Sequence, residues 1–371
     1  MSYDRREFLT HTASAALTLC AGSSAAEQIR PPAARTEVAW LPDVLEPPAN
    51  VTPPPRPLAP ILDDGRGGRI ATVAEWERRR TELESLWRTV LGRMDVDRTH
   101  APRLDVIAEE HVGGIDRQLV RYVVEPDVHT EAYVLAPRAP RSNCPGAVVF
   151  HSTTPESIRQ PAGLADVREK HFAVALAERG FVAICPRNFL WPETTRMSAD
   201  RETRRFRERH PRARGMAKML HDGQVALDIL LARSGVDGSR VGCIGHSLGA
   251  KEALYLSAFD PRVTAVVASE GGIGLTMSNW DAEWYLGDIV GRTDFAREHH
   301  ELLALAAPRP FLLVGGDSAD GTASWPWITA AQPVYRLYGA PARLGLLNHK
   351  RGHAVPPDAL PRLLEWLETY V

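Results

Sequence analysis

The chain has 371 residues, of which 44% are hydrophobic and 24% are charged, and its formal net charge at pH 7 is −2. These values are typical of a globular protein with one large or two ordinary domains, and the near-neutral charge gives no reason to expect nucleic acid as a partner. No apolar run approaches the roughly 20 residues that a membrane-spanning helix needs, so no membrane span is expected.

The first 26 residues have the pattern of an export signal. The twin-arginine pair Arg5-Arg6 is followed by an apolar pair, a weakly apolar run and small residues up to Ala26. This order is typical of a signal peptide for the twin-arginine translocation (Tat) machinery and predicts a periplasmic or secreted protein. Lipidation at Cys20, which would give a membrane-anchored lipoprotein, is an alternative.

Residues 27–70 contain many prolines and predict an extended lead-in. A helix is expected from residue 72 to residue 91, because Trp76, Leu83 and Trp87 recur at helical spacing between charged residues. This helix is predicted to be an accessory element at the start of the main domain, which is expected over residues 71–371.

The rest of the chain alternates between short apolar runs and helical patterns. An antiparallel meander is expected first, with strands near 104–111, 117–124 and 130–136. Further strands are expected at 146–150, 181–185, 240–244, 263–269, 310–315 and 342–347. Helices are expected between or after them, at 165–179, 216–233, 250–258, 324–338 and 357–370. The alternation predicts an α/β fold with a mostly parallel central sheet and helices on both faces.

Three of the four cysteines follow the predicted signal peptide. Cys185 and Cys243 lie in strand-like runs and are expected to be buried thiols, and no C-x-x-C spacing indicates a metal or redox site. A disulfide between Cys144 and Cys185 remains open. No metal or organic cofactor is implied.

The strongest motif is the G-x-S-x-G pattern at residues 245–249. An apolar strand precedes it and a helix follows it, which is the context of a nucleophile elbow. A serine hydroxyl is a weak nucleophile, and the sharp turn of such an elbow exposes it at the edge of the sheet. We therefore predict that Ser247 is a catalytic nucleophile.

Ser247 needs a base and an acid, which follow it in that fold in the order Ser, Asp or Glu, His. His353, between the last strand and the last helix, is the expected base, with His349 as the alternative. Asp320 is the preferred acid. Glu270 and Asp317 are alternatives, because all three follow strands whose carboxyl ends meet at one edge of the sheet.

The oxyanion hole needs two backbone N–H donors. One is expected from Leu248, the residue after the nucleophile. The other is expected from Ser152 or Thr153, in the loop after the strand that ends at Phe150.

With these motifs, the chain from about residue 70 resembles the α/β-hydrolase superfamily, in particular the bacterial acetyl xylan esterase-like or dienelactone-hydrolase-like branch. Dienelactone hydrolases use a cysteine nucleophile, where this chain has Ser247. A narrower similarity is to glucuronoyl esterases, in which a lysine four residues after the nucleophile contacts the sugar and the acid can follow the next strand. Lys251 and Glu270 match these positions, whereas Leu248 replaces an arginine.

The resemblance implies a serine carboxylic-ester hydrolase that acts on carbohydrate-linked esters, of the acetyl xylan or glucuronoyl type. The insertion at 273–300 carries Trp280 and Trp284, which either bind sugar rings or pack beneath a lid. An arginine-rich insertion at 188–214 is either a solvated helical face or a positive rim. The alternatives to an esterase are another serine acyl hydrolase, such as a peptidase or lactonase, and a silent fold that binds carbohydrate or protein.

Overall fold

The computed structural model describes residues 37–96, 98, 100–139, 142–339 and 341–371. The predicted signal peptide at 1–26, with Cys20, and the first ten residues of the lead-in lie outside the described residues. None of the helices in the described ranges combines the length and the apolar character that crossing a membrane requires.

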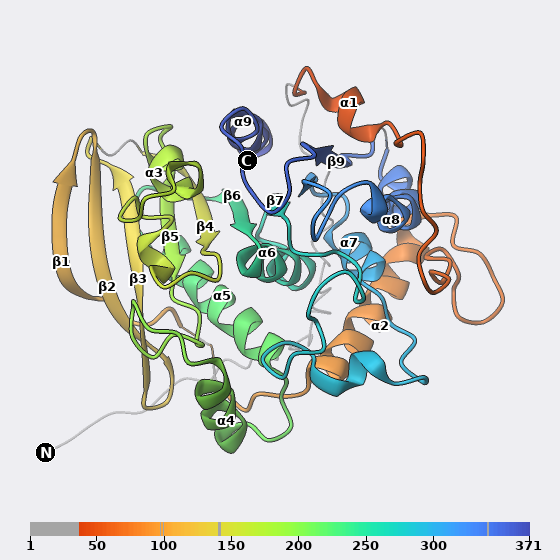
Figure 1. The fold of residues 1–371 in the computed structure, drawn as a ribbon, viewed down its shortest axis with the longest axis horizontal. Helices are drawn as coiled ribbons and strands as arrows, with labels where there is room; N and C mark the ends of the chain where they lie inside the picture. The colour runs from red at the N-terminus through yellow and green to blue at the C-terminus, as the bar shows by residue number, and fades with distance from the viewer. Residues whose placement is uncertain (1–36, 97, 99, 140–141, 340) are drawn as a thin grey trace, which may run out of the picture. The chain divides into compact units, whose positions relative to one another are not determined.

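A nine-stranded sheet forms the centre of the described part. Its strands are β1 (Asp105–Val112), β2 (Ile115–Glu125), β3 (Val128–Pro137), β4 (Cys144–Phe150), β5 (Val182–Pro186), β6 (Val236–His246), β7 (Ala265–Ser269), β8 (Phe311–Gly315) and β9 (Leu344–Asn348). Their order across the sheet is β1-β2-β3-β5-β4-β6-β7-β8-β9 (Figure 1). The pairs β1–β2, β2–β3 and β3–β5 are antiparallel, and the other five pairs are parallel. The predicted architecture, an antiparallel opening followed by a parallel sheet, is confirmed.

Helices cover both faces of the sheet. They are α1 (Leu41–Leu45), α2 (Val73–Leu91), α3 (Phe172–Ala177), α4 (Ala199–Arg209), α5 (Gly215–Leu231), α6 (Leu248–Phe259), α7 (His300–Ala306), α8 (Trp325–Leu337) and α9 (Leu360–Tyr370). One apolar core contains residues of α1, α3 and α9, and the other contains residues of α2 and α5 to α8. Successive residues of β4 alternate between these cores: Ala147 and Val149 belong to the first, Val148 and Phe150 to the second. A strand in the middle of such a sheet is buried on both faces, so it is apolar throughout.

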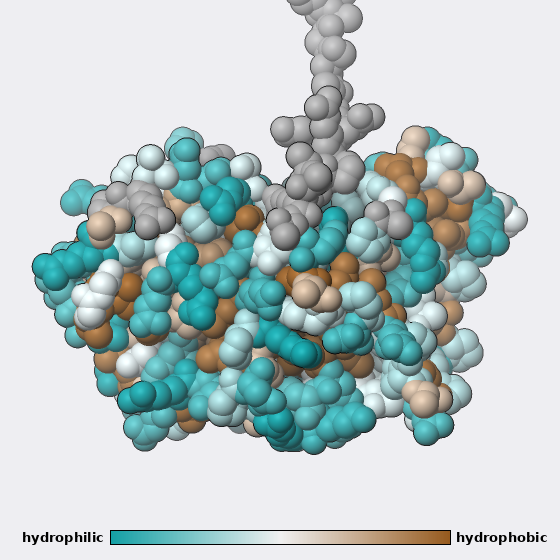
Figure 2. Space-filling model, turned by 90° about the horizontal axis from the view of Figure 1, so that it is seen from above, coloured by the Kyte–Doolittle hydropathy of each residue, from teal (hydrophilic) through white to brown (hydrophobic). Residues whose placement is uncertain are grey.

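Large apolar side chains are mostly inside. The largest fully buried ones include Trp76, Trp87, Trp191, Trp280, Trp327 and Trp366. The face seen in Figure 2 is mostly hydrophilic, with smaller hydrophobic areas between the polar residues. The tryptophans of the predicted accessory helix therefore serve as packing anchors.

The described part of the lead-in packs against the C-terminal elements. The indole of Trp40 donates to Glu365 at 2.7 Å and lies 5.8 Å from the ring of Trp366, centroid to centroid. The Glu37 carboxylate accepts from Arg343 and from the hydroxyl of Tyr370. The sequence predicted an extended segment here and missed α1, which is only five residues long.

Two helices of the structure differ from the sequence prediction. The helix expected at 165–179 is limited to α3, because residues 166–168 are exposed and have no apolar face to pack. The short helix α7 was not predicted, since its seven residues are all buried and show no alternation of polar and apolar positions.

Cys185 is a free, buried thiol whose pKa is raised by burial, so no disulfide joins it to Cys144.

Candidate active site

Ser247 lies between β6 and α6 with φ 59° and ψ −115°, in the strained left-handed region that non-glycine residues rarely adopt. Two glycines permit this turn. A Cβ on Gly245 would lie 2.2 Å from the backbone of Gly249, and a Cβ on Gly249 would lie 2.6 Å from the carbonyl oxygen of Phe150. The Ser247 amide donates to the carbonyl of Ser269 on the adjacent strand at 2.7 Å. This is the geometry predicted for a nucleophile elbow.

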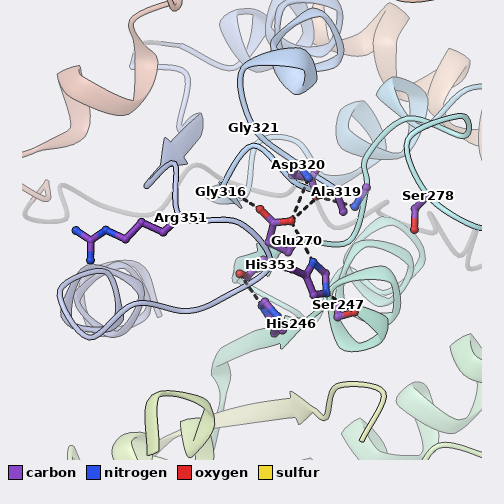
Figure 3. A network of polar contacts seen from close by, with 12 residues as sticks. His246, Ser247, Glu270, Ser278, Gly316, Ala319, Asp320, Gly321, Arg351 and His353 are labelled. Carbon is purple, nitrogen blue, oxygen red and sulfur yellow. Dashed lines mark hydrogen bonds and ion pairs between the residues drawn. The ribbon is translucent and has the colours of Figure 1, made fainter. Parts of the chain in front are cut away.

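His353 lies between the nucleophile and a carboxylate (Figure 3). Its Nε2 is 2.9 Å from Ser247 Oγ and its Nδ1 is 3.2 Å from Glu270 Oε2. The imidazole is 44% exposed, whereas the Glu270 side chain is fully buried. A substrate can thus reach the histidine but not the acid, and Ser247 is partly exposed. The structure brings Ser247 and His353 together as the sequence predicted.

Glu270 is held rigidly at the end of β7. Its amide donates to Val314 at 2.8 Å, and its φ of 57° turns the chain sharply away from the strand. Its carboxylate accepts from the backbone amides of Gly316, Ala319 and Asp320, the Ala319 contact being 2.7 Å. These donors fix the carboxylate against His353.

The preference for Asp320 as the acid is therefore corrected. The Asp320 carboxylate accepts from the amides of Gly272 at 2.7 Å and Ile273 at 2.8 Å and from the hydroxyl of Ser324 at 2.8 Å. It holds the segment after β7, and burial raises its pKa. The third candidate, Asp317, is exposed. Its carboxylate accepts from the Thr322 amide in its own loop, and this hydrogen bond is the main cause that lowers its pKa. Sequence spacing could not separate three carboxylates that all follow strands at one edge of the sheet.

Two other histidines lie near the site. The alternative base His349 accepts from the Arg351 amide through Nδ1 at 3.1 Å, and burial lowers its pKa. His246, directly before the nucleophile, is fully buried, and its Nδ1 lies 3.0 Å from Ser269 Oγ. Burial lowers its pKa well below the usual value. Only His353, among these three histidines, bonds Ser247.

The loop after β4 narrows the choice of the second oxyanion donor. The amide of Ser152 already donates to the side chain of Gln160 at 3.2 Å. Thr153, the other predicted residue, is exposed. Leu248 begins α6, so its N–H belongs to the first turn of that helix, whose amides have no acceptor within the helix. The Ser152 amide is thus already bonded, which leaves the N–H groups of Leu248 and Thr153 as the candidate donors.

Lys251 and Trp280 are not open to a substrate in this conformation. The Lys251 side chain is 3% exposed. Its Nζ donates to Ser278 at 2.8 Å and lies 4.0 Å from the ring centre of Trp280. Burial lowers the pKa of Lys251 to about 7. Trp280, 1% exposed, donates to the Gly272 carbonyl, so it packs beneath the segment after β7 and presents no free face to a sugar. Trp284 is half-buried.

The arginine-rich insertion forms a solvated face more than a positive rim. Six of its eight arginines make ion pairs: Arg201, Arg205, Arg207, Arg209, Arg212 and Arg214. Their partners include Glu202, Glu283 and Asp95. The carboxylates thus offset most of the positive charge.

One histidine beside the site was not predicted from the sequence. His151 follows β4 directly, is 1% exposed and contacts the loop in which the second oxyanion donor is predicted. Its position one residue before the predicted donors was a signal for a role in that loop.

Part of the chain matches a family model and a curated relative. Residues 130–282, from β3 to the segment after β7, match the model of the Dienelactone hydrolase family. The curated 4-O-methyl-glucuronoyl methylesterase 1 of Wolfiporia cocos (strain MD-104) is 28% identical over 160 residues. That region covers 34% of this chain and 38% of the relative, so the match spans well under half of the relative's length.

Solved structures extend the likeness over most of the chain. A glucuronoyl esterase from Solibacter usitatus has a TM-score of 0.66 at 15% identity, covering 85% of this chain and 98% of that one. A glucuronoyl esterase from Teredinibacter turnerae has a TM-score of 0.64 at 18% identity, covering 84% and 88%. At these identities the likeness concerns the fold, which is the α/β-hydrolase fold, as predicted.

Proposed function

We propose that this α/β-hydrolase-fold chain is a serine carboxylic-ester hydrolase that acts on carbohydrate-linked esters through an acyl-enzyme. The observation that carries the proposal is the chain of contacts from Ser247 Oγ through His353 to the buried carboxylate of Glu270. A nucleophile, a base and an orienting acid within hydrogen-bond reach are the parts that this chemistry needs.

In the first half-reaction, Ser247 Oγ attacks the ester carbonyl carbon while His353 Nε2 takes the hydroxyl proton. The Glu270 carboxylate accepts from Nδ1–H and stabilises the imidazolium that forms. The carbonyl oxygen becomes an oxyanion, which the amides of Leu248 and Thr153 stabilise. The tetrahedral intermediate then collapses: the C–O bond to the alcohol breaks, His353 gives its proton to the leaving alcohol oxygen, and the acyl group remains on Ser247.

In the second half-reaction, His353 removes a proton from water, and the resulting hydroxide attacks the acyl carbon. The tetrahedral intermediate collapses, the C–O bond to Ser247 breaks, and the serine oxygen recovers its proton from His353. The products are a carboxylic acid, an alcohol and the free enzyme.

Labelling with a fluorophosphonate probe tests the enzyme class. Wild-type protein should be labelled, and Ser247→Ala should not be. Wild-type protein that resists the probe while it binds carbohydrate or protein would instead favour a silent binding fold.

The substrate class rests on the relatives, whose names describe glucuronoyl esters. A panel of acetylated xylan, glucuronoyl esters and p-nitrophenyl acyl esters tests it. Turnover of the carbohydrate esters should exceed that of the simple acyl esters. Faster cleavage of peptides or lactones would favour the other acyl hydrolases.

We also propose export through the Tat machinery to the periplasm or beyond, on the strength of the pair Arg5-Arg6 and the run up to Ala26. Changing both arginines to lysine should keep the enzyme activity in the cytoplasmic fraction. Undiminished export of that variant would contradict the proposal. Metabolic labelling with a fatty acid tests for a lipid on Cys20.

A further inference from the structure

We propose that His151 is a positioning residue of the oxyanion hole, which sets the direction of the Thr153 N–H. The inference rests on the proposed function, because it concerns the transition state of ester hydrolysis. It is carried by the contacts of a fully buried histidine that makes no bond to the nucleophile, the base or the acid.

The two ring nitrogens of His151 contact two different segments, the loop after β4 and the residues just after β5. Its Nδ1 lies 2.7 Å from the carbonyl oxygen of Ser152, and its Nε2 lies 3.2 Å from the backbone nitrogen of Asn188, just after β5. The Asn188 N–H can only donate and the Ser152 carbonyl can only accept. Nε2 is therefore the acceptor and Nδ1 carries the proton, so one neutral tautomer satisfies both contacts. Burial, the main cause, lowers the pKa of His151 to about 4, which keeps it neutral.

The bond to Ser152 determines where the next amide points. The Ser152 carbonyl and the Thr153 N–H belong to the same peptide group, which is planar and trans, so they point in opposite directions. When His151 holds the carbonyl, the N–H of Thr153 points within the same plane in the direction away from His151. A donor that is already aimed costs no reorganisation when the oxyanion forms.

Two more contacts immobilise the same loop. Gln160 accepts from the Ser152 amide at 3.2 Å, and the indole of Trp191 donates to the Thr154 carbonyl at 3.1 Å. The Trp191 ring also meets the His151 imidazole edge to face, with centroids 4.8 Å apart. Rotation of the peptide group between Ser152 and Thr153 would break the bond to His151 first.

The same histidine connects the two halves of the oxyanion hole. The side chain of Asn188 donates to Glu252 at 3.0 Å, and Glu252 lies on α6, the helix that begins with Leu248. The path from His151 through Asn188 to Glu252 thus joins the loop that carries one donor to the helix that carries the other.

Two conservative substitutions distinguish the two ring nitrogens. The amide nitrogen of asparagine lies close to the position of histidine Nδ1, whereas the end of glutamine lies close to Nε2. His151→Asn can keep the bond to the Ser152 carbonyl, and His151→Gln can keep only the bond from Asn188. His151→Ala removes both.

We expect His151→Ala and His151→Gln to lower kcat roughly 100-fold, as loss of an oxyanion donor does, with KM little changed. His151→Asn should stay within about tenfold of the wild type, since it keeps one hydrogen bond of the usual strength. Inhibition by a boronic acid, which forms a tetrahedral adduct with the serine, should weaken in parallel with kcat/KM.

His300 is the matched control. It is also 1% exposed, it bonds the carbonyl of Ala59 through Nε2 at 3.0 Å, and burial lowers its pKa to about 4. His300→Ala should lower the thermal midpoint of unfolding but leave kcat unchanged.

Three results would overturn the inference: full kcat in a folded His151→Ala, an equal loss of kcat in His300→Ala, or better activity of the glutamine variant than of the asparagine variant. If His151→Ala does not fold, the Asn and Gln pair decides the question. Failure of the proposed function looks different, because Ser247→Ala would then retain ester hydrolysis.

Discussion

Replacing Glu270 by glutamine tests the assignment of the acid most directly. The carboxylate accepts from three backbone amides and from His353, and it donates to nothing. Glutamine has nearly the same shape but has one oxygen and one NH₂ group, which only donates. Whichever position the NH₂ group takes, it faces at least one backbone N–H.

The structure indicates how large the effect should be. If the NH₂ group takes the place of Oε2, it faces the Ala319 amide and His353 Nδ1, and the imidazole must then hold its proton on Nε2, toward Ser247. A histidine in that tautomer cannot accept the serine proton, so in this orientation kcat should fall about 10³- to 10⁴-fold, equivalent to about 4–5.5 kcal/mol. If the NH₂ group takes the place of Oε1, it faces the Gly316 amide and His353 keeps its tautomer, but the negative charge that stabilises the imidazolium is lost and kcat still falls. The unpaired amide should lower the free energy of unfolding by about 1–3 kcal/mol.

Asp320→Asn is the comparison. Its loss of acceptors for Gly272 and Ile273 should also destabilise the fold by about 1–3 kcal/mol, but kcat on p-nitrophenyl acetate should fall less than about tenfold. Both variants are assayed at a temperature at which circular dichroism shows them folded. Equal inactivation of the two folded variants, or a nearly active Glu270→Gln, would refute the reasoning.

Three further predictions concern the elbow, the buried lysine and the substrate. Gly249→Ala should lower the free energy of unfolding by about 3 kcal/mol or more, because its Cβ would meet backbone atoms of Phe150. Gly291 has open space around it, so Gly291→Ala should have the melting temperature of the wild type. Lys251 has a pKa of about 7 when folded and near 10.5 when unfolded, so its ammonium destabilises the folded state increasingly as pH falls. The stability of Lys251→Met relative to wild type, measured by urea unfolding, should therefore rise by about 3 kcal/mol from pH 9 to pH 6, and a constant difference would contradict the burial of the charge. If the segment after β7 opens to let a uronate reach Lys251, the same variant loses kcat/KM on methyl glucuronate esters at least about tenfold more than on acetates; equal losses count against a uronate contact.

The sequence predicted those features that depend on local pattern. The elbow at Ser247 and the base at His353 were predictable, because each lies in a glycine-containing segment between a strand and the helix that follows it in the chain. The apolar runs of the parallel strands likewise predicted the sheet, since such strands are buried on both faces.

The acid could not be predicted in the same way. Glu270 and Asp320 both follow buried strands, and only the backbone amides around them decide which one faces His353. The burial of Trp280 could not be predicted either. Whether an aromatic residue in an insertion packs inside or binds a ligand depends on contacts with residues far away in the chain. The role of His151 depends on Asn188, which lies 37 residues further on.

The nucleophile and the acid directly follow two neighbouring, paired strands, since His246, the last residue of β6, opposes Ser269, the last residue of β7. The base comes from much further along the chain, 83 residues after Glu270 and 106 residues after Ser247. Contacts of such long separation pay a large loop-closure entropy and tend to form late in folding. A partly folded chain can therefore hold its serine and carboxylate in register and still be inert. The return of esterase activity during refolding would time the docking of β9, and it would do so without any introduced label.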